Sequence, residues 1–222
     1  MKHSWTVASI VIALLGYRTP ALAQAPTAAE KAAAASSAAV DFGPFAAAAF
    51  NSSTFITTPF QDVLQTTIKP PGGKDLFINV SMETGIFTTT DLQNQAGFGL
   101  TLAQPDTQLQ VRVVIDCPDC PQPYIERPAE PATVNFDNVF RSVLHASSSG
   151  FDAQNEIKDQ LGVRSFSFVA RDVGVGIHTI RVQARFTTAS SALSINGFAF
   201  SSVQARIGTR TATVEEIKLD AH

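Results

Sequence analysis

Residues 179–186 read Thr-Ile-Arg-Val-Gln-Ala-Arg-Phe, and polar and apolar side chains alternate through the whole stretch. On a helix, positions i, i+2 and i+4 would be spread around the cylinder, whereas on a strand they form one face. The same alternation recurs over residues 76–82, 109–113 and 166–170, where β-branched and aromatic residues are frequent. The sequence therefore predicts a chain built mainly from strands with one apolar and one polar face.

Turn signals separate these stretches, notably at residues 70–73, 105–106 and 174–176. Roughly ten strands at this spacing are typical of an all-β sandwich or barrel, and no strand–helix–strand rhythm suggests a parallel sheet. We predict an antiparallel β-sandwich that is jelly-roll-like, with an immunoglobulin-like sandwich as the alternative. The one predicted helix covers residues 152–161, with Asp152 as N-cap and Ile157 and Leu161 on one side.

The first 23 residues have the three-part form of a secretory signal peptide. A short basic start precedes an apolar run over residues 5–17, and Ala21 and Ala23 are the small residues before a cut. The run is shorter than the roughly 20 residues that span a bilayer, and no later segment reaches that length. We expect a secreted or periplasmic protein that begins at Gln24 and has no membrane span.

An alanine-rich segment follows the signal peptide. Residues 25–49 contain thirteen Ala, which favours helix but offers few large side chains for docking. We therefore predict a flexible or partly helical spacer over residues 24–50 and place the β-sandwich domain at 51–222.

The charge balance argues against nucleic acid as a partner. Lys2 and Arg18 are lost with the signal peptide, which leaves 14 basic and 19 acidic side chains, a net charge of −5. No short stretch of the sequence has three Lys or Arg residues close together, as a basic face that binds nucleic acid by releasing counterions from phosphate would need. The chain as a whole is 45% hydrophobic and only 16% charged, as expected for a folded domain with an uncharged polar surface.

The two cysteines, Cys117 and Cys120, have a spacing compatible with three chemistries. A redox pair needs its first thiolate at a helix N-terminus, and Pro118, Pro121 and Pro123 oppose a helix there. A structural zinc ion needs about four ligands, and no second Cys or His pair completes the set. We expect a local disulfide that stiffens a loop and adds about 2 kcal/mol.

The residues around this loop are the candidate ligand site: Asp116, Asp119, Tyr124 and His178. The carboxylates lack the spacing and central Gly of an EF-hand, so we predict neither a metal nor a cofactor. Tyr124 offers a ring on which a ligand can stack. His178 begins a strand on an apolar face, where a ring satisfied by the backbone is a simpler role than that of a base or ligand.

No catalytic residues emerge from the sequence. It has no Gly-x-Ser-x-Gly elbow, and its nineteen acids do not single out a pair for glycoside hydrolysis. The leading hypothesis is an exported, non-catalytic module that binds a glycan, a surface polymer or a protein partner. Two alternatives stay open: a self-assembling structural envelope component, because low charge leaves strand edges unprotected, and a secreted hydrolase with an unidentified carboxylate pair.

Overall fold

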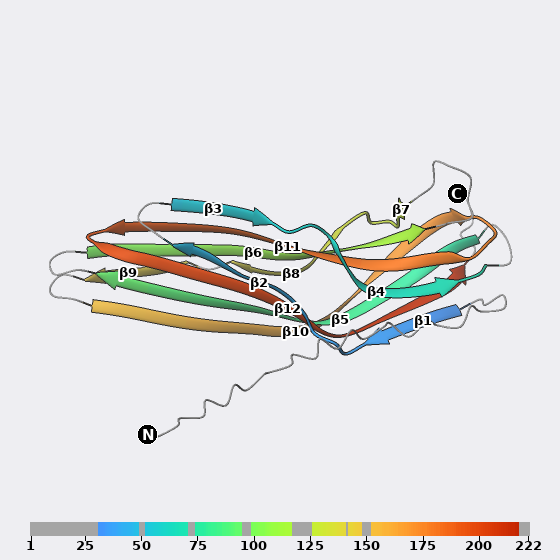
Figure 1. Cartoon of the computed structure of the whole chain (residues 1–222), viewed down its shortest axis with the longest axis horizontal. Coiled ribbons are helices and arrows are strands. Elements are labelled where there is room, and N and C mark those ends of the chain that lie inside the picture. The colour runs from blue at the N-terminus through green and yellow to red at the C-terminus, as the bar shows by residue number, and fades with distance from the viewer. Residues whose placement is uncertain are drawn as a thin grey trace, which may run out of the picture.

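The computed structural model describes residues 31–48, 52–70, 74–94, 99–116, 126–140, 142–147 and 152–217. All regular elements within these ranges are strands, and the long ones run along the longest axis of the molecule (Figure 1). They are β1 (Lys31–Ser36), β2 (Val40–Ala48), β3 (Ser52–Thr57), β4 (Gln61–Ile68), β5 (Lys74–Asn94), β6 (Gly99–Asp116), β7 (Arg127–Pro128), β8 (Val134–Phe140), β9 (Val143–Ser147), β10 (Asp152–Val173), β11 (His178–Ile195) and β12 (Gly197–Ile217).

The strands form two antiparallel sheets. Sheet A has the order β1-β12-β5-β10, with β2 also paired to β12. Sheet B has the order β3-β11-β6-β7, with β4 also on β11 and with β8 and β9 on β6. Some short strands share one edge of a sheet: β1 with β2, β3 with β4, and β7 with β8 and β9. When each such group is counted as one position, the chain has eight positions. Numbered along the chain, these positions have the order 1-8-3-6 in sheet A and 2-7-4-5 in sheet B. This is the order of a jelly roll, so the predicted fold class is confirmed.

The core lies between the two sheets and follows the period-two pattern. Ile180, Val182 and Phe186 of β11 are at most 1% exposed, as are Leu109 and Val111 on the neighbouring strand β6. The part of the sandwich that holds β2, β3 and β9 has a more polar interior. Its buried side chains include Thr88, Thr90, Thr101, Thr107, Thr188 and Ser201.

The predicted spacer is wrong over residues 31–48. β1 pairs with residues 210–215 of β12, and β2 pairs with the same strand between residues 200 and 207. Ala32 and Ala34 pack against the core, and Phe42 is buried within it. The helix propensity of alanine is a weak preference, and pairing along the edge of β12 outweighs it. The folded domain therefore includes residues that precede the predicted start at Asn51.

The predicted helix over residues 152–161 is also wrong, because this segment is the first half of β10. Every residue from Asp152 to Ala170 has a register partner in β5. Ile157 and Leu161 do share one side, but it is the solvent-facing side of a strand, and each is 68% exposed. A ladder of this length outweighs the local helix signals.

Candidate ligand-binding face

Half of the predicted ligand loop, together with the cysteine pair, lies outside the described residues. Cys117, Cys120, Asp119 and Tyr124 fall between residues 117 and 125, so their roles and the disulfide stay predictions. Asp116 at the end of β6 and His178 at the start of β11 are described.

Asp116 and His178 lie on opposite faces of sheet B. Asp116 is the register partner of Thr179, so its side chain shares the outer face with Thr179, and the preceding residue His178 points inward. His178 is 2% exposed, and its Nε2 lies 2.7 Å from the carbonyl oxygen of Gly174. Because a carbonyl oxygen only accepts, Nε2 is the donor, and His178 anchors the β10–β11 turn.

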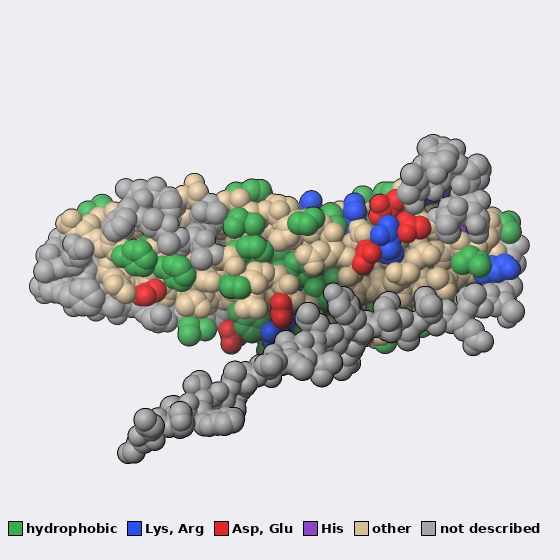
Figure 2. Space-filling model, viewed as in Figure 1, with side chains coloured by type: hydrophobic (Ala, Val, Ile, Leu, Met, Phe, Trp, Pro, Cys, Tyr) green, Lys and Arg blue, Asp and Glu red, His purple; other side chains and the backbone are tan. Residues whose placement is uncertain are grey.

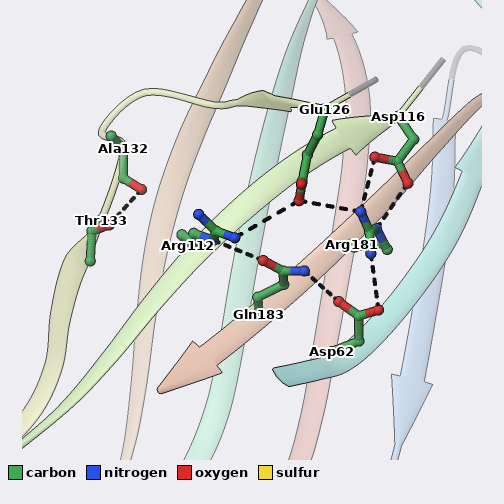
Figure 3. Close-up of polar contacts among 8 residues, drawn as sticks. All are labelled: Asp62, Arg112, Asp116, Glu126, Ala132, Thr133, Arg181 and Gln183. Carbon is green, nitrogen blue, oxygen red and sulfur yellow. Dashed lines mark hydrogen bonds and ion pairs between the residues drawn. The ribbon is translucent and has the colours of Figure 1, made fainter. Parts of the chain in front are cut away.

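Asp116 belongs instead to an ion-pair cluster around Arg181 (Figure 3). The Nε of Arg181 lies 2.9 Å from Oδ2 of Asp116, its Nη1 lies 3.3 Å from Oδ2 of Asp62, and its Nη2 lies 3.2 Å from Oε1 of Glu126. Figure 2 shows a dense group of acidic and basic side chains near the position of β4 and β7 in Figure 1, on a face that is otherwise mostly uncharged. This cluster joins three strands of sheet B to the segment that follows residue 125.

The guanidinium of Arg181 occupies the centre of this acidic group. Partial burial acts to lower the pKa of Arg181, but the hydrogen bond that Arg181 donates to Asp116 and the charges of Asp62 and Asp116 outweigh it and raise that pKa. Across the described ranges, no group of three or more His, Cys, Asp or Glu is arranged to hold a metal ion. The acids here stabilise the fold by pairing with arginine.

The polar network continues from the cluster along the outer face. Gln183 Nε2 donates to Asp62 Oδ1 at 2.6 Å, and Gln183 Oε1 accepts from Arg112 Nε at 2.8 Å. The Cζ of Arg112 lies 4.2 Å from the centre of the Phe60 ring, and the Cζ of Arg185 lies 4.6 Å from it. Both cations are therefore held by cation–π contacts as well as by hydrogen bonds.

Amide side chains extend this network toward β8. Arg185 Nε donates to Gln110 Oε1 at 2.7 Å, and Gln110 Nε2 donates to Asn135 Oδ1 at 3.0 Å. These groups are fixed by partners within the protein, so binding a ligand here would require little ordering of side chains.

A groove of about 350 Å³ lies on the outer face of sheet B, beside this network. It is open to solvent, and strands β3, β6 and β11 supply its walls and floor. Its lining includes Phe55, Thr57, Asp106, Gln108, Thr187 and Ala189. The side chains are mainly hydroxyls and amides, with one exposed aromatic ring.

Sequence reasoning assigned no function to the lining residues, and its turn signal at residues 105–106 is wrong, because Asp106 lies within the continuous strand β6. One signal was available, since Gln104, Asp106, Gln108, Gln110 and Arg112 occupy every second position of β6 and form one polar face. Which residues of β3 and β11 stand beside them depends on strand order and register. The period-two pattern does not contain that information.

Comparisons with known proteins do not assign the chain to a family. No family model matches it, and no curated protein matches it. Among solved structures, "Structure of infectious bursal disease virus Gx strain" matches at 13% identity, covering 91% of this chain and 47% of that one, with a TM-score of 0.25. The corresponding Gt strain structure matches at 9% identity, covering 93% and 45%, with a TM-score of 0.16. The chain thus spans less than half the length of either, and at these TM-scores neither bears on its function.

Among the described residues, no helix is long and apolar enough to cross a bilayer.

Proposed function

We propose that this protein is an exported, non-catalytic jelly-roll module that binds a neutral, hydroxyl-rich polymer, namely a glycan, on the outer face of sheet B. The groove beside Phe55 is the observation that carries the proposal. Amide and hydroxyl side chains both donate and accept hydrogen bonds, as sugar hydroxyls do, and an exposed ring adds an apolar surface for a sugar face.

The charges in the groove favour a neutral ligand. Asp106 is the one carboxylate in its lining, and the cation of Arg185 is already engaged by Gln110 and by the ring of Phe60. An anionic polymer would meet the negative charge of Asp106 without a free cation beside it.

The same lining favours binding over hydrolysis. A glycosidase of the usual kind needs two carboxyl groups on opposite sides of the scissile bond. Within the described part of the chain the groove contains one, and the cluster of Asp62, Asp116 and Glu126 is bound to Arg181. We therefore expect binding without release of new reducing ends.

Export is part of the proposal and rests on residues 1–23. N-terminal sequencing of protein recovered from the producing cell should give Gln24, and retention of Met1 in the exported fraction would contradict it. In the same compartment Cys117 and Cys120 are expected to be oxidised. Reduction and alkylation of the intact protein should then add two labels that are absent without reductant.

The binding claim can be tested with the purified protein and a panel of insoluble and soluble neutral polysaccharides. We expect at least one to bind, and replacement of the register partners Gln108 and Thr187 by Ala to weaken that binding about tenfold or more. A matched control replaces Thr211 and Ser81, register partners on the outer face of sheet A, and should bind normally. Failure of every polysaccharide to bind, or equal loss in both variants, would reject the proposed face.

A second candidate function is self-assembly, which the edge of β10 favours. Apart from the Glu130–Val169 bridge, no strand in the described ranges pairs with the second edge of β10. Leu161 and Val163, 68% and 73% exposed, lie on the solvent-facing side of this strand. Long edge strands with unpaired backbone groups pair readily with other strands.

Mass measurement in solution distinguishes this candidate from a monomeric module. If β10 pairs between copies, Leu161→Lys with Val163→Lys should convert an oligomer to a monomer, whereas Val175→Lys in the β10–β11 turn should not. A wild-type protein that stays monomeric at high concentration would exclude this function.

A further inference from the structure

A row of four residues crosses sheet B through the groove, one from each of four adjacent strands. Phe55 of β3 is the register partner of Ala189 of β11, Ala189 is the partner of Asp106 of β6, and Asp106 is the partner of Phe140 of β8. Register partners in antiparallel strands point to the same side of the sheet. Because Asp106 lines the groove, all four side chains lie on the outer face.

The two ends of the row are the most exposed phenylalanines of the described chain. Phe55 is 71% exposed and Phe140 is 70% exposed, whereas every other phenylalanine whose side chain is described is buried or half-buried. The two residues stand three strand spacings apart, about 14 Å. Two aromatic rings left in water at the ends of one row indicate an apolar contact that the described residues do not supply.

Between the rings the floor is low and polar. Ala189 has a small side chain, which leaves space above β11. Asp106 has no hydrogen-bond or ion-pair partner within the described residues, so its oxygens can accept hydrogen bonds from a ligand. Gln104 and Gln108 flank Asp106 along β6 and add both donors and acceptors.

We propose that the ligand is a linear, neutral oligosaccharide that crosses the strands from Phe55 to Phe140. One sugar ring stacks on each phenylalanine, and hydroxyls of the sugars between them donate hydrogen bonds to Asp106. This inference rests on the proposed function and specifies which contacts the same face makes with its ligand. It requires a chain long enough to span both rings, so affinity must rise with oligosaccharide length until both are covered.

The test measures affinity by calorimetry for fragments of increasing length from a polysaccharide that the protein binds. With fragments long enough to span the row, Phe55→Ala and Phe140→Ala should each weaken binding about five- to tenfold. The shortest fragments cover one ring only. For them, the variant with both Phe55→Ala and Phe140→Ala should lose no more affinity than the more sensitive of the two single variants. Ala189→Leu fills the space above β11 and should weaken the binding of long fragments more than that of short ones. Phe87 is a half-buried ring on the outer face of sheet A. Phe87→Ala is therefore the matched control and should leave the affinity for every fragment unchanged.

The outcomes separate this inference from the proposed function. If Gln108 and Thr187 variants lose binding while Phe140→Ala does not, or if short and long fragments bind equally well, the face binds glycans but not along this row. If no polysaccharide binds, the proposed function itself fails. A loss of folding in any variant is recognised by circular dichroism, and Phe55→Leu and Phe140→Leu then replace the alanine variants.

Discussion

Arg164 of β10 donates a hydrogen bond at 3.0 Å to the carboxylate of Asp137 in β8, and so connects an edge of sheet A to an edge of sheet B. Asp137 is only 3% exposed, and it also accepts from Thr84 Oγ1 at 2.9 Å and from Gln160 Nε2 at 3.2 Å. A register shift in the β6–β8 pairing explains its inward position. The extra residue on β8 turns both Phe136 and Asp137 toward the interior.

Asp137→Ala should lower the free energy of unfolding by about 2–3 kcal/mol, because three side-chain donors lose a buried acceptor. Urea unfolding followed by circular dichroism measures this. Asn138→Ala, at the exposed neighbouring position, should cost less than about 0.5 kcal/mol. A loss below about 1 kcal/mol for Asp137→Ala would show that the contact between the sheet edges is not a major source of stability.

The pair formed by Asp41 and Arg206 predicts a loss of stability in acid. Hydrogen bonds from Arg206, at 2.6 and 3.2 Å, lower the pKa of Asp41 below its ordinary value of 3.8, against a smaller opposing effect of burial. A carboxyl group with a lowered pKa in the folded state stabilises fully above its unfolded pKa, and this is lost as pH falls through the folded value.

The free energy of unfolding should therefore fall as the pH drops below the ordinary Asp pKa of 3.8, and Arg206→Gln should reduce that fall. Both side chains are about half exposed, so the difference should shrink in high salt. An identical pH dependence in the variant would contradict the assignment of this effect to Asp41.

Gly43 is predicted to be intolerant of any side chain. Its φ is +97°, and an added Cβ would lie 3.0 Å from the carbonyl oxygen of Val203. Gly43→Ala should destabilise the protein by about 1–3 kcal/mol. Gly162→Ala in β10 is the matched control, since nothing lies within 4 Å of the added Cβ and its φ is not in the left-handed region. Equal melting temperatures for the two variants would refute this prediction.

Arg210 is predicted to hold the N-terminal strands in place. It is 5% exposed, and burial lowers its pKa. Its guanidinium donates to the carbonyl oxygens of Ala38 (2.6 Å), Gly208 (3.0 Å) and Val63. It thus joins the β1–β2 connection to β4 of the other sheet.

Arg210→Ala should lower stability by about 2–4 kcal/mol, because it removes the donor from the buried contact with Val63 and from the part-buried contacts with Ala38 and Gly208. Hydrogen exchange should quicken most over residues 31–48. Thr211→Ala, one residue along and exposed, should leave exchange unchanged. Uniform acceleration over the whole domain would instead mean that Arg210 supports the core generally.

The sequence by itself determined the all-β character of the protein and the faces of its central strands. Alternation over 179–186 and 109–113 predicts which side chains are buried, because a strand exposes successive residues on opposite sides regardless of its partners. His178 was interpreted as a residue whose ring is satisfied by the backbone; its Nε2 bonds the carbonyl oxygen of Gly174, whereas its buried Nδ1 has no hydrogen-bond partner among the described residues. These properties depend on residues that are neighbours in the chain.

Only the tertiary structure decided the strands at 31–48 and 152–161 and the composition of the candidate site. Alanine and an N-capping Asp favour helix locally, and long ladders with β12 and β5 override that preference. Phe55, Asp106, Phe140 and Ala189 become neighbours through strand order and register. A one-residue slip in any of these ladders would move a side chain to the other face, so their row exists only in the folded molecule.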